Sequence, residues 1–590
     1  MTETTSRIEL TNILSDLLKQ TPKEFISQVC YMTQGKLHPD FEGIELGIAE
    51  KTVSKALQRA YGTDPSKIQE LLRKTGDLGD VASQLAKNKS QQALFSERLT
   101  VKKVYDTLDE IAKSTGQGSI EVRINKLAAL LNSADPIEAK FLVRFVTGKL
   151  RLGVADYTVL DALAVAFTGD KKNRSRLEKA YNLTSDLGYV AQLLVGSGIE
   201  SVDKVKVTVG KPVRPMLAER MDSSEKIIER LSGDAASEYK LDGERVQIHK
   251  SFSGQVELYS RRLERITSHF GDVVEAVSTL PVKSLIVEGE VVALDREGKY
   301  LPFQELMHRR RKYGVEEAMK NYPVSLNLFD ILLQDGKELI DESYSSRRNA
   351  LEKLYSKSKS SDTISLVPAK RVSSAEEIDK MMEEALSLGC EGLVIKDPRS
   401  SYRAGAREFA WIKYKPEYIT GVRDTLDLVI VGASYGMGRR AGTFGTFLLA
   451  AYDPKADVFR TTTKVGTGFS DSDLEHLTKL LSKYKLETKN PRVDARVAPD
   501  VWFEPRVVIE ILASEITLSP VYTAGLDSVR KGSGLALRFP KFTGKIRDDK
   551  APEDATTVDE LLELYKKQIR QFKSSSAEDE AAIESKNESD

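Results

Sequence analysis

The chain has 590 residues, of which 40% are hydrophobic and 30% charged, with 88 basic and 88 acidic side chains. The length predicts three or four domains, and the lack of any apolar run near the roughly 20 residues that span a bilayer argues against a membrane protein. Zero net charge excludes a simple polycation that coats nucleic acid, although the acidic tail Ala577–Asp590 leaves the remainder mildly positive.

Cysteine usage and the start of the chain bear on location. Cys30 and Cys390 are too far apart to indicate a metal motif or a disulfide framework, which fits a reducing compartment. The start, Met1–Thr4, is polar and is not followed by the apolar segment of a signal peptide. We therefore expect a cytoplasmic protein.

Residues 1–208 are predicted to form an all-helical domain. Apolar residues recur at helical spacing in Ile8–Leu18, Val122–Leu131 and Phe141–Leu152. Two interpretations of the basic residues at the expected helix ends stay open: ordinary solvated faces, or contacts to a phosphate backbone. These residues are Lys87, Lys89, Lys102, Lys103, Lys149, Arg151, Lys171, Lys172, Arg174 and Arg176.

One short element in this region combines a glutamine with an apolar and an aromatic residue. Gln91, Leu94 and Phe95 have the chemistry of a plug that fits a hydrophobic pocket on a partner. Leu94 and Phe95 could equally be core residues of the helical domain, which is the commoner role of such side chains.

Residues 209–417 are predicted to form a mixed α/β domain, because strand patterns alternate with a few helices. The expected strands are Val246–Lys250, Val256–Ser260, Ser284–Leu294, Ser325–Leu333, Gly392–Lys396 and Ala410–Lys415. The expected helices are Ser223–Leu231, Phe303–Arg310, Ser346–Tyr355 and Ala375–Leu388, the last closed by Gly389.

Residues 418–573 are predicted to form a small β-barrel with an inserted helix and a last helix. The inserted helix is Ser470–Leu481, and Thr557 with Glu560 forms a capping box at the start of the last helix. The expected strands are Leu426–Gly432, Thr446–Tyr452, Arg460–Val465, Val507–Ala513 and Gly534–Phe539. Residues 574–590 are acidic and serine-bearing, so we expect a disordered tail.

The densest chemistry lies in the pattern Lys240-x-Asp242-Gly243-x-Arg245, which precedes the expected strand pair. A lysine becomes a useful nucleophile when burial or nearby cations make its neutral form available. A tight turn with solvated charges explains the same six residues equally well. The pattern alone leaves both interpretations open.

Other strands of this domain carry charges inside apolar runs. The strand period of two places Lys413 and Lys415 on one face, and it does the same for Glu288 and Glu290. Glu391 stands at the mouth of an apolar strand. Buried charges need partners of opposite charge. These side chains could pair with one another, or they could pair with a bound triphosphate and its metal ion. Together these positions indicate a triphosphate site.

The ordered motif series resembles that of ATP-dependent DNA ligases, and the helical N-terminal third resembles the archaeal and eukaryotic replicative type. The resemblance covers residues 1 to about 570. The members of the series are Lys240-x-Asp242-Gly243-x-Arg245, Ser260-Arg261, Glu288-Gly289-Glu290, Leu328-Phe329-Asp330, Glu391–Lys396, Trp411–Lys415 and Leu537–Phe542, with Arg151-Leu152-Gly153 and Gly438–Gly442 beside them.

This resemblance implies a covalent lysine nucleotidyltransferase with a DNA-binding domain, an adenylation domain and an OB-fold barrel that closes over the nucleotide. Lys240 would take AMP from ATP and pass it to the 5′-phosphate of a nick in DNA replication, repair or recombination. The implied nucleotide contacts are Glu238, Arg245, Arg261, Glu290, Phe329, Arg407, Lys413, Lys415, Arg538 and Lys541.

The resemblance also implies a metal and partners. Glu391, helped by Glu290, would hold Mg²⁺, which Mn²⁺ could replace. The implied partners are nicked duplex DNA, bound by Arg151, Arg439 and Arg440, and a sliding clamp (PCNA), bound by Gln91, Leu94 and Phe95. A monomer in an archaeal-type cell is expected.

Two other functions fit parts of the chain. An RNA ligase or an mRNA-capping guanylyltransferase shares the lysine motif and the barrel, but is not expected to carry the helical N-terminal domain. A DNA-clamping scaffold without catalysis would keep the domains and lose the covalent chemistry. Sealing of nicked DNA excludes the first alternative, and a covalent label from ATP excludes the second.

Overall fold

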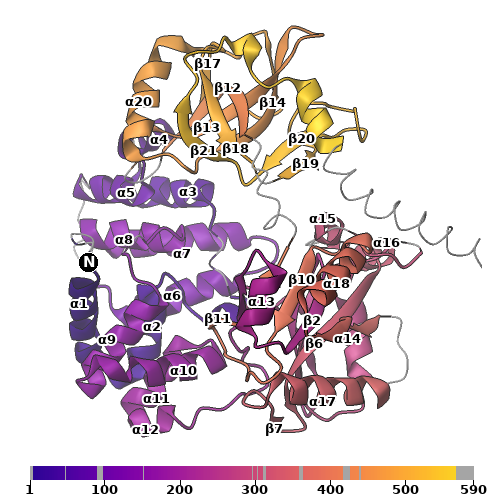
Figure 1. Ribbon diagram of the computed structural model, residues 1–590. Helices are drawn as coiled ribbons and strands as arrows, with labels where there is room; N and C mark the ends of the chain where they lie inside the picture. The colour runs from indigo at the N-terminus through magenta and orange to yellow at the C-terminus, as the bar shows by residue number, and fades with distance from the viewer. Residues whose placement is uncertain are drawn as a thin grey trace, which may run out of the picture. The chain divides into compact units, whose positions relative to one another are not determined.

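The computed structural model of the chain contains two compact units (Figure 1). One consists of Met1–Gly62 with Ala86–Ile419, and the other of Thr63–Leu85 with Thr420–Asp590. Within the residues that the structure describes, no helix is long and apolar enough to cross a membrane. Those residues are 4, 6–44, 46, 48–88, 98–150, 152–295, 297–301, 303–309, 314–357, 363–415, 425–436, 440, 442–513 and 515–566.

The N-terminal part of the first unit is helical, as predicted. Local capping explains where several helices begin: Ser6 accepts from the Glu9 amide at one start, and Asp135 forms a capping box with Glu138 at another. The helices are α1 (Arg7–Gln20), α2 (Ile26–Thr33), α3 (Glu50–Tyr61), α6 (Val101–Lys113), α7 (Ser119–Ser133), α8 (Pro136–Val146), α9 (Asp156–Thr168), α10 (Arg174–Thr184), α11 (Leu187–Ser197) and α12 (Ile199–Val202). Buried leucines and valines of α1, α2, α9, α10 and α11 form one core.

The rest of this unit is built on two sheets. The first has the order β1 (Leu217–Arg220), β11 (Arg407–Tyr414), β10 (Gly392–Lys396), β2 (Ala235–Lys240) and β9 (Ala369–Val372). The second has the order β4 (Val256–Ser260), β3 (Glu244–Lys250), β5 (Leu285–Ala293), β6 (Val324–Gln334) and β7 (Lys337–Glu338), and β8 (Ile364–Leu366) pairs with β6.

Helices cover these sheets. α18 (Ala375–Ser387) packs on β2 and β10, and α13 (Ser224–Arg230) packs on α18 and β11 (Figure 1). On its other face the first sheet meets the second, where the Trp411 and Phe329 rings lie 6.2 Å apart. The other helices are α14 (Gly271–Ser278), α15 (Phe303–Leu306), α16 (Val315–Asn321) and α17 (Tyr344–Lys357).

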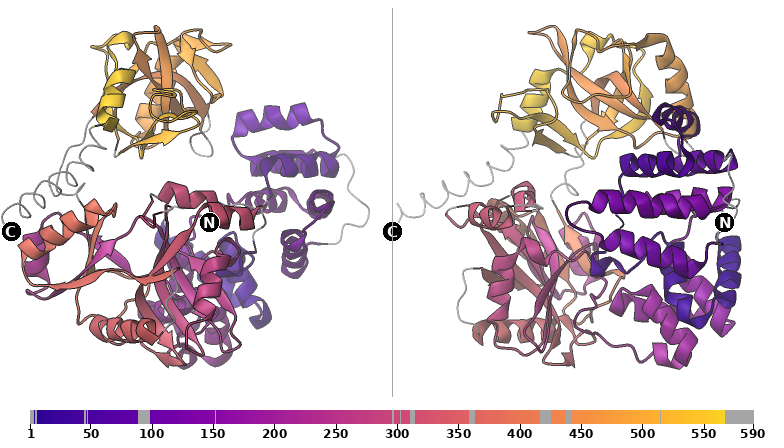
Figure 2. Two further views of the ribbon diagram at one scale, coloured as in Figure 1. Left: turned by 90° about the vertical axis from the view of Figure 1, so that its right-hand side faces the viewer. Right: turned by 180° about the vertical axis from the view of Figure 1, so that it is seen from behind.

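The second unit contains a curled, mostly antiparallel sheet, visible in both views of Figure 2. Its long strands are β12 (Thr425–Tyr435), β13 (Phe444–Asp453), β14 (Val458–Val465), β18 (Val508–Leu512) and β21 (Lys541–Ile546). The short strands are β15 (Lys485–Leu486) and β16 (Val493–Asp494) at the ends of the strand order, and β17 (Val501–Phe503) between β15 and β12. The separate pair is β19 (Glu515–Ser519) and β20 (Gly534–Arg538). This is the predicted barrel.

The predicted helices of this unit are also present. The inserted helix α20 (Asp471–Leu481) starts with a capping box of Ser470 and Asp473. The last helix begins at Val558, and Thr557 and Glu560 form its predicted capping box. The same unit includes α4 (Pro65–Thr75) and most of α5 (Leu78–Lys87).

Candidate active site

Lys240 is the last residue of β2, a strand that the sequence pattern did not predict. The three residues that follow it lead directly into β3 of the other sheet. Gly243 is needed in this turn, because a side-chain Cβ there would lie 2.3 Å from the Val291 carbonyl oxygen and 2.9 Å from Glu290 Cγ. The close approach brings the turn that follows Lys240 against β5.

One carboxylate joins two lysines across this end of the sheet. Lys240 pairs with Gly392 in the strand register, and Glu391 precedes that glycine. Lys240 Nζ lies 2.5 Å from Glu391 Oε2, and Lys415 Nζ lies 2.9 Å from the same oxygen. The glycine permits this spacing, since a Cβ at Gly392 would lie 2.4 Å from the Tyr414 carbonyl oxygen.

The carboxylates around Lys240 differ in protonation. Although burial opposes ionisation, Lys240 and Lys415 hold the pKa of Glu391 down at about 2. Burial and a hydrogen bond with Glu391 raise the pKa of Asp242 to about 6. Burial raises the pKa of Glu290 to about 7, against the opposing charges of Lys240 and Arg245. Two acids therefore titrate near neutrality beside a permanent carboxylate.

Further cations gather beside Lys240, Glu391 and Lys415, the group of side chains that we call the cleft. Burial lowers the pKa of Lys413, and so do the positive charges of Arg407, Lys415, Arg261 and Lys240. Lys413 and Lys240 lie on one face of the sheet, because their cross-strand partners Val394 and Gly392 are two residues apart. Such a cluster of like charges is stabilised by a polyanion, so it is suited to phosphate groups.

A buried polar network lies further along β2, around Glu238. Glu238 Oε2 is 2.6 Å from Lys396 Nζ, and its Oε1 accepts a hydrogen bond from the Tyr344 hydroxyl. The Lys396 ammonium is 5.0 Å from the centre of the Phe329 ring and 4.2 Å from that of Trp411. Aromatic surface and a fixed carboxylate thus lie together at this end, which suits recognition of a flat heterocycle with an amino group.

Arg245 is held by protein groups in this structure. It donates to the Met216 carbonyl at 2.9 Å and to Glu288 Oε2 at 2.8 Å, and its guanidinium lies 5.4 Å from the Phe329 ring centre. Its Nε is buried and has no hydrogen-bond partner among the described residues. Arg245 is thus fixed between Met216 and Glu288, with one buried donor that the described residues leave unsatisfied.

Other predicted site residues lie elsewhere. Arg538 ends β20 and Lys541 begins β21, both in the second unit. Arg440 is also there, with its Nε 3.5 Å from Asp471 Oδ1. Five predicted contacts fall outside the described residues: Arg151, Arg439, Gln91, Leu94 and Phe95. Within the described part, no three His, Cys, Asp or Glu side chains converge as a metal-holding group.

The sequence analysis assigned no role to three residues of the cleft. Lys396 ends the apolar run of β10, so its charge among apolar neighbours was a signal that it needed a buried partner. Asp242 was part of the quoted motif, but its bond with Glu391 joins residues far apart in sequence. Trp411 had no distinguishing signal beyond its apolar setting.

Comparison with known proteins agrees with this arrangement. Residues 1–164, 215–415 and 440–550 match the families described as DNA ligase N terminus, ATP dependent DNA ligase domain and ATP dependent DNA ligase C terminal region. The chain is 50% identical to DNA ligase 2 of Thermofilum pendens, over 96% of this chain and 95% of the relative. It is 48% identical to the DNA ligase of Cenarchaeum symbiosum, over 96% of each. The chain therefore belongs to the family of ATP-dependent DNA ligases.

Proposed function

We propose that the protein seals nicks between a 5′-phosphate and a 3′-hydroxyl in duplex DNA through a lysine–AMP intermediate on Lys240, in replication, repair and recombination. Membership of the family makes it an ATP-dependent DNA ligase. The observation that carries the assignment of Lys240 is its position: it shares Glu391 with Lys415 beside the cation cluster around Lys413.

Three displacements at phosphorus account for the reaction. The neutral Lys240 amine forms a P–N bond to the α-phosphorus of ATP and loses a proton, while the bond from that phosphorus to the bridging oxygen of the β-phosphate breaks, so pyrophosphate leaves. A 5′-phosphate oxygen of the nick then attacks the same phosphorus, the P–N bond breaks, and the amine leaves after taking up a proton. Finally the 3′-hydroxyl oxygen attacks the 5′-phosphorus, loses its proton and expels AMP. The overall joining reaction is thus divided into three easier steps by the covalent intermediates.

The remaining residues would bind and orient the nucleotide. Lys413 and Lys415 would hold the α-phosphate, Glu238 would accept from the amino group of adenine, and Phe329 would stack on its ring. The ribose and the other phosphates would meet Arg245, Arg261, Glu290 and Arg407. Arg538 and Lys541 would orient the pyrophosphate when the barrel closes.

A divalent cation fits the two acids of the cleft. Glu290 is a half-buried carboxylate whose pKa is raised by burial, and a nearby cation would stabilise its charged form. We propose that Glu290 and Glu391 hold Mg²⁺, with Mn²⁺ as a substitute, because magnesium takes one or two carboxylates together with substrate phosphates. The ion would neutralise charge on the phosphates.

The metal requirement should depend on pH through Glu290. Its pKa of about 7 means that the carboxylate is mostly protonated at pH 6 and charged at pH 8. Protons compete with the metal, so the Mg²⁺ concentration for half-maximal self-adenylation should rise up to about tenfold per unit below pH 7. The Glu290→Gln variant should need more Mg²⁺ and lose this part of the pH dependence, whereas an identical profile in both proteins would contradict the assignment.

Further contacts remain proposals. We assign DNA contacts to Arg151, Arg439 and Arg440, and the clamp contact to Gln91, Leu94 and Phe95, in a monomer of the cytoplasm. The proposed domains are 1–208, 209–417 and 418–573, followed by the tail 574–590, and the three family matches support this division.

Substrate comparison tests the proposed function. Purified protein, ATP and Mg²⁺ are incubated with a labelled nicked DNA duplex and with the same nick in RNA, and the products are separated on a denaturing gel. We expect joining of the DNA at least about 100-fold faster, a margin of roughly 2.7 kcal/mol in the transition state. Preferential joining of RNA, or no joining of DNA, would contradict the proposal.

A further inference from the structure

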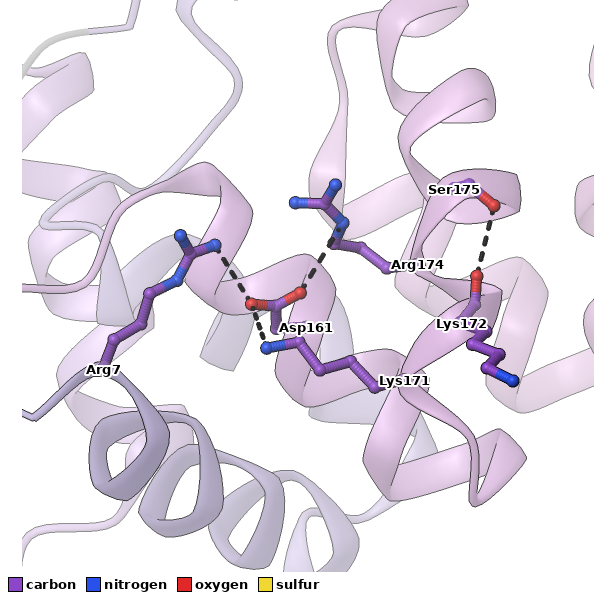
Figure 3. A pocket seen from close by; sticks show the side chains of 6 residues that line it. All are labelled: Arg7, Asp161, Lys171, Lys172, Arg174 and Ser175. Carbon is purple, nitrogen blue, oxygen red and sulfur yellow. Dashed lines mark hydrogen bonds and ion pairs between the residues drawn. The ribbon is translucent and has the colours of Figure 1, made fainter.

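Four cations line a hollow of about 430 Å³ in the helical region, separate from the residues of the cleft (Figure 3). They come from three elements: Arg7 starts α1, Lys171 and Lys172 form the short turn before α10, and Arg174 starts α10. Asp161 of α9 is the only carboxylate among the described lining residues. The lining therefore carries a net charge of about +3.

Asp161 contacts three of these four cations. Its side chain is fully buried, with Oδ2 3.1 Å from Arg7 Nη2 and 3.2 Å from Lys171 Nζ. Oδ1 lies 3.6 Å from Arg174 Nε. Figure 3 shows these three side chains approaching the carboxylate from different sides. One buried carboxylate thus fixes the positions of three positive groups.

These contacts leave most donors available. An arginine has five N–H donors and a lysine three, and the contacts with Asp161 use a single nitrogen of each side chain. The Arg7 and Lys171 side chains remain 58% and 55% exposed, so a ligand can reach them. Nearby, Glu178 takes a second nitrogen of Arg174, 3.4 Å away, and Asp170 accepts from the Lys172 amide. Glu178 and Asp170 do not line the hollow.

One carboxylate needs about one positive charge as partner, so the pairing of Asp161 does not account for four cations. We propose that the hollow is a binding site for a phosphate group, outside the adenylation cleft. A phosphate offers several acceptor oxygens and up to two charges, which match the multiple donors converging from α1, the turn at Lys171 and Lys172, and α10. The group comes either from a DNA backbone or from a free polyphosphate.

The variant that tests this site is Lys171→Gln with Lys172→Gln, because Arg7 and Arg174 still pair with the buried Asp161 and the fold is kept. The matched control is Lys67→Gln with Lys74→Gln, which removes two lysines that also share one carboxylate, Glu70. Self-adenylation with labelled ATP requires a folded adenylation domain and Lys240, which neither variant changes. A normal yield of label in both variants therefore shows that the protein is folded and that the proposed function is intact, whatever the phosphate measurements show.

Two measurements distinguish a phosphate of the DNA backbone from a free polyphosphate. The DNA measurement rests on the proposed function. Affinity for nicked duplex is measured from about 0.05 to 0.2 M salt, and each lost backbone contact should lower the slope of log K against log salt by about 0.9. Tripolyphosphate is titrated calorimetrically, and the Lys171/Lys172 variant should bind one equivalent less than the wild type. A loss of DNA affinity or of tripolyphosphate binding in the Lys171/Lys172 variant that exceeds the loss in the control variant supports the site, and the measurement that changes identifies the ligand. Equality with the control in both measurements overturns it.

Discussion

Replacing Lys240 with alanine should abolish the covalent label from α-labelled ATP and lower nick sealing by at least about 10⁴-fold, as removal of a catalytic nucleophile does elsewhere. The phosphoramidate cannot form without the amine. Affinity for nicked duplex should stay within about threefold of wild type, because many backbone contacts share the binding energy. Label transfer and electrophoretic mobility shift measure the two effects.

Two controls distinguish loss of the nucleophile from a general loss of positive charge. Lys226→Ala removes an exposed lysine of the same part of the chain, which pairs with Asp222 four residues earlier, and should keep both activities. Joining of a nick that already carries AMP on its 5′-phosphate bypasses the first two steps, so Lys240→Ala should retain part of that reaction. Label retention by Lys240→Ala, or equal loss of binding and sealing, would contradict the assignment.

Glu238→Gln should lower the free energy of unfolding by about 3–5 kcal/mol, the usual cost of breaking a buried ion pair. The amide can still accept from the Tyr344 hydroxyl, but Lys396, which is 1% exposed, loses its nearest countercharge. Urea unfolding followed by fluorescence measures the change.

The pH dependence of this variant has a definite sign. Burial already lowers the pKa of Lys396, and loss of the Glu238 charge lowers it further. The unfolded chain then binds more protons between the folded pKa and about 10.4, so the stability of the variant relative to wild type should increase as pH rises through that range. A deficit that is constant with pH would contradict the buried-charge explanation.

A surface pair at the start of the same strand provides the comparison. Asp234 precedes β2 and pairs with Arg371 at 2.6 Å, but the two side chains are 42% and 53% exposed. Asp234→Asn should therefore cost roughly 0–1 kcal/mol. If Glu238→Gln costs no more than Asp234→Asn, the network around Lys396 does not contribute to stability as the structure indicates.

Much of the fold follows from periodicity, and the exceptions have local causes. The strand Gly392–Lys396 has the predicted bounds, and α18 begins at Ala375 as expected. β2 was missed because Ala235–Lys240 contains no β-branched residue and mixes small, acidic and aromatic side chains. The tertiary structure overrides this weak local preference by placing β2 between β10 and β9.

The site could be predicted only in part. The strand period alone put Lys413 and Lys415 on one side, and the motif singled out Lys240. The sharing of Glu391 by two lysines depends on the register of three strands, which no local pattern specifies. The link between Glu238 and Lys396 likewise joins distant segments.

Because Glu391 already bridges Lys240 and Lys415, the two ammonium groups have an anion between them before any nucleotide arrives. In the proposed reaction, binding of the α-phosphate would be an exchange of counter-ions: Lys415 would pass from the Glu391 carboxylate to the phosphate, and Lys240 would leave the carboxylate to attack as a neutral amine. The energetic gain is the difference between two ionic contacts, which is small beside the full cost of stripping water from two charges. A cleft built this way can bind ATP and release AMP in every turnover without holding either too tightly.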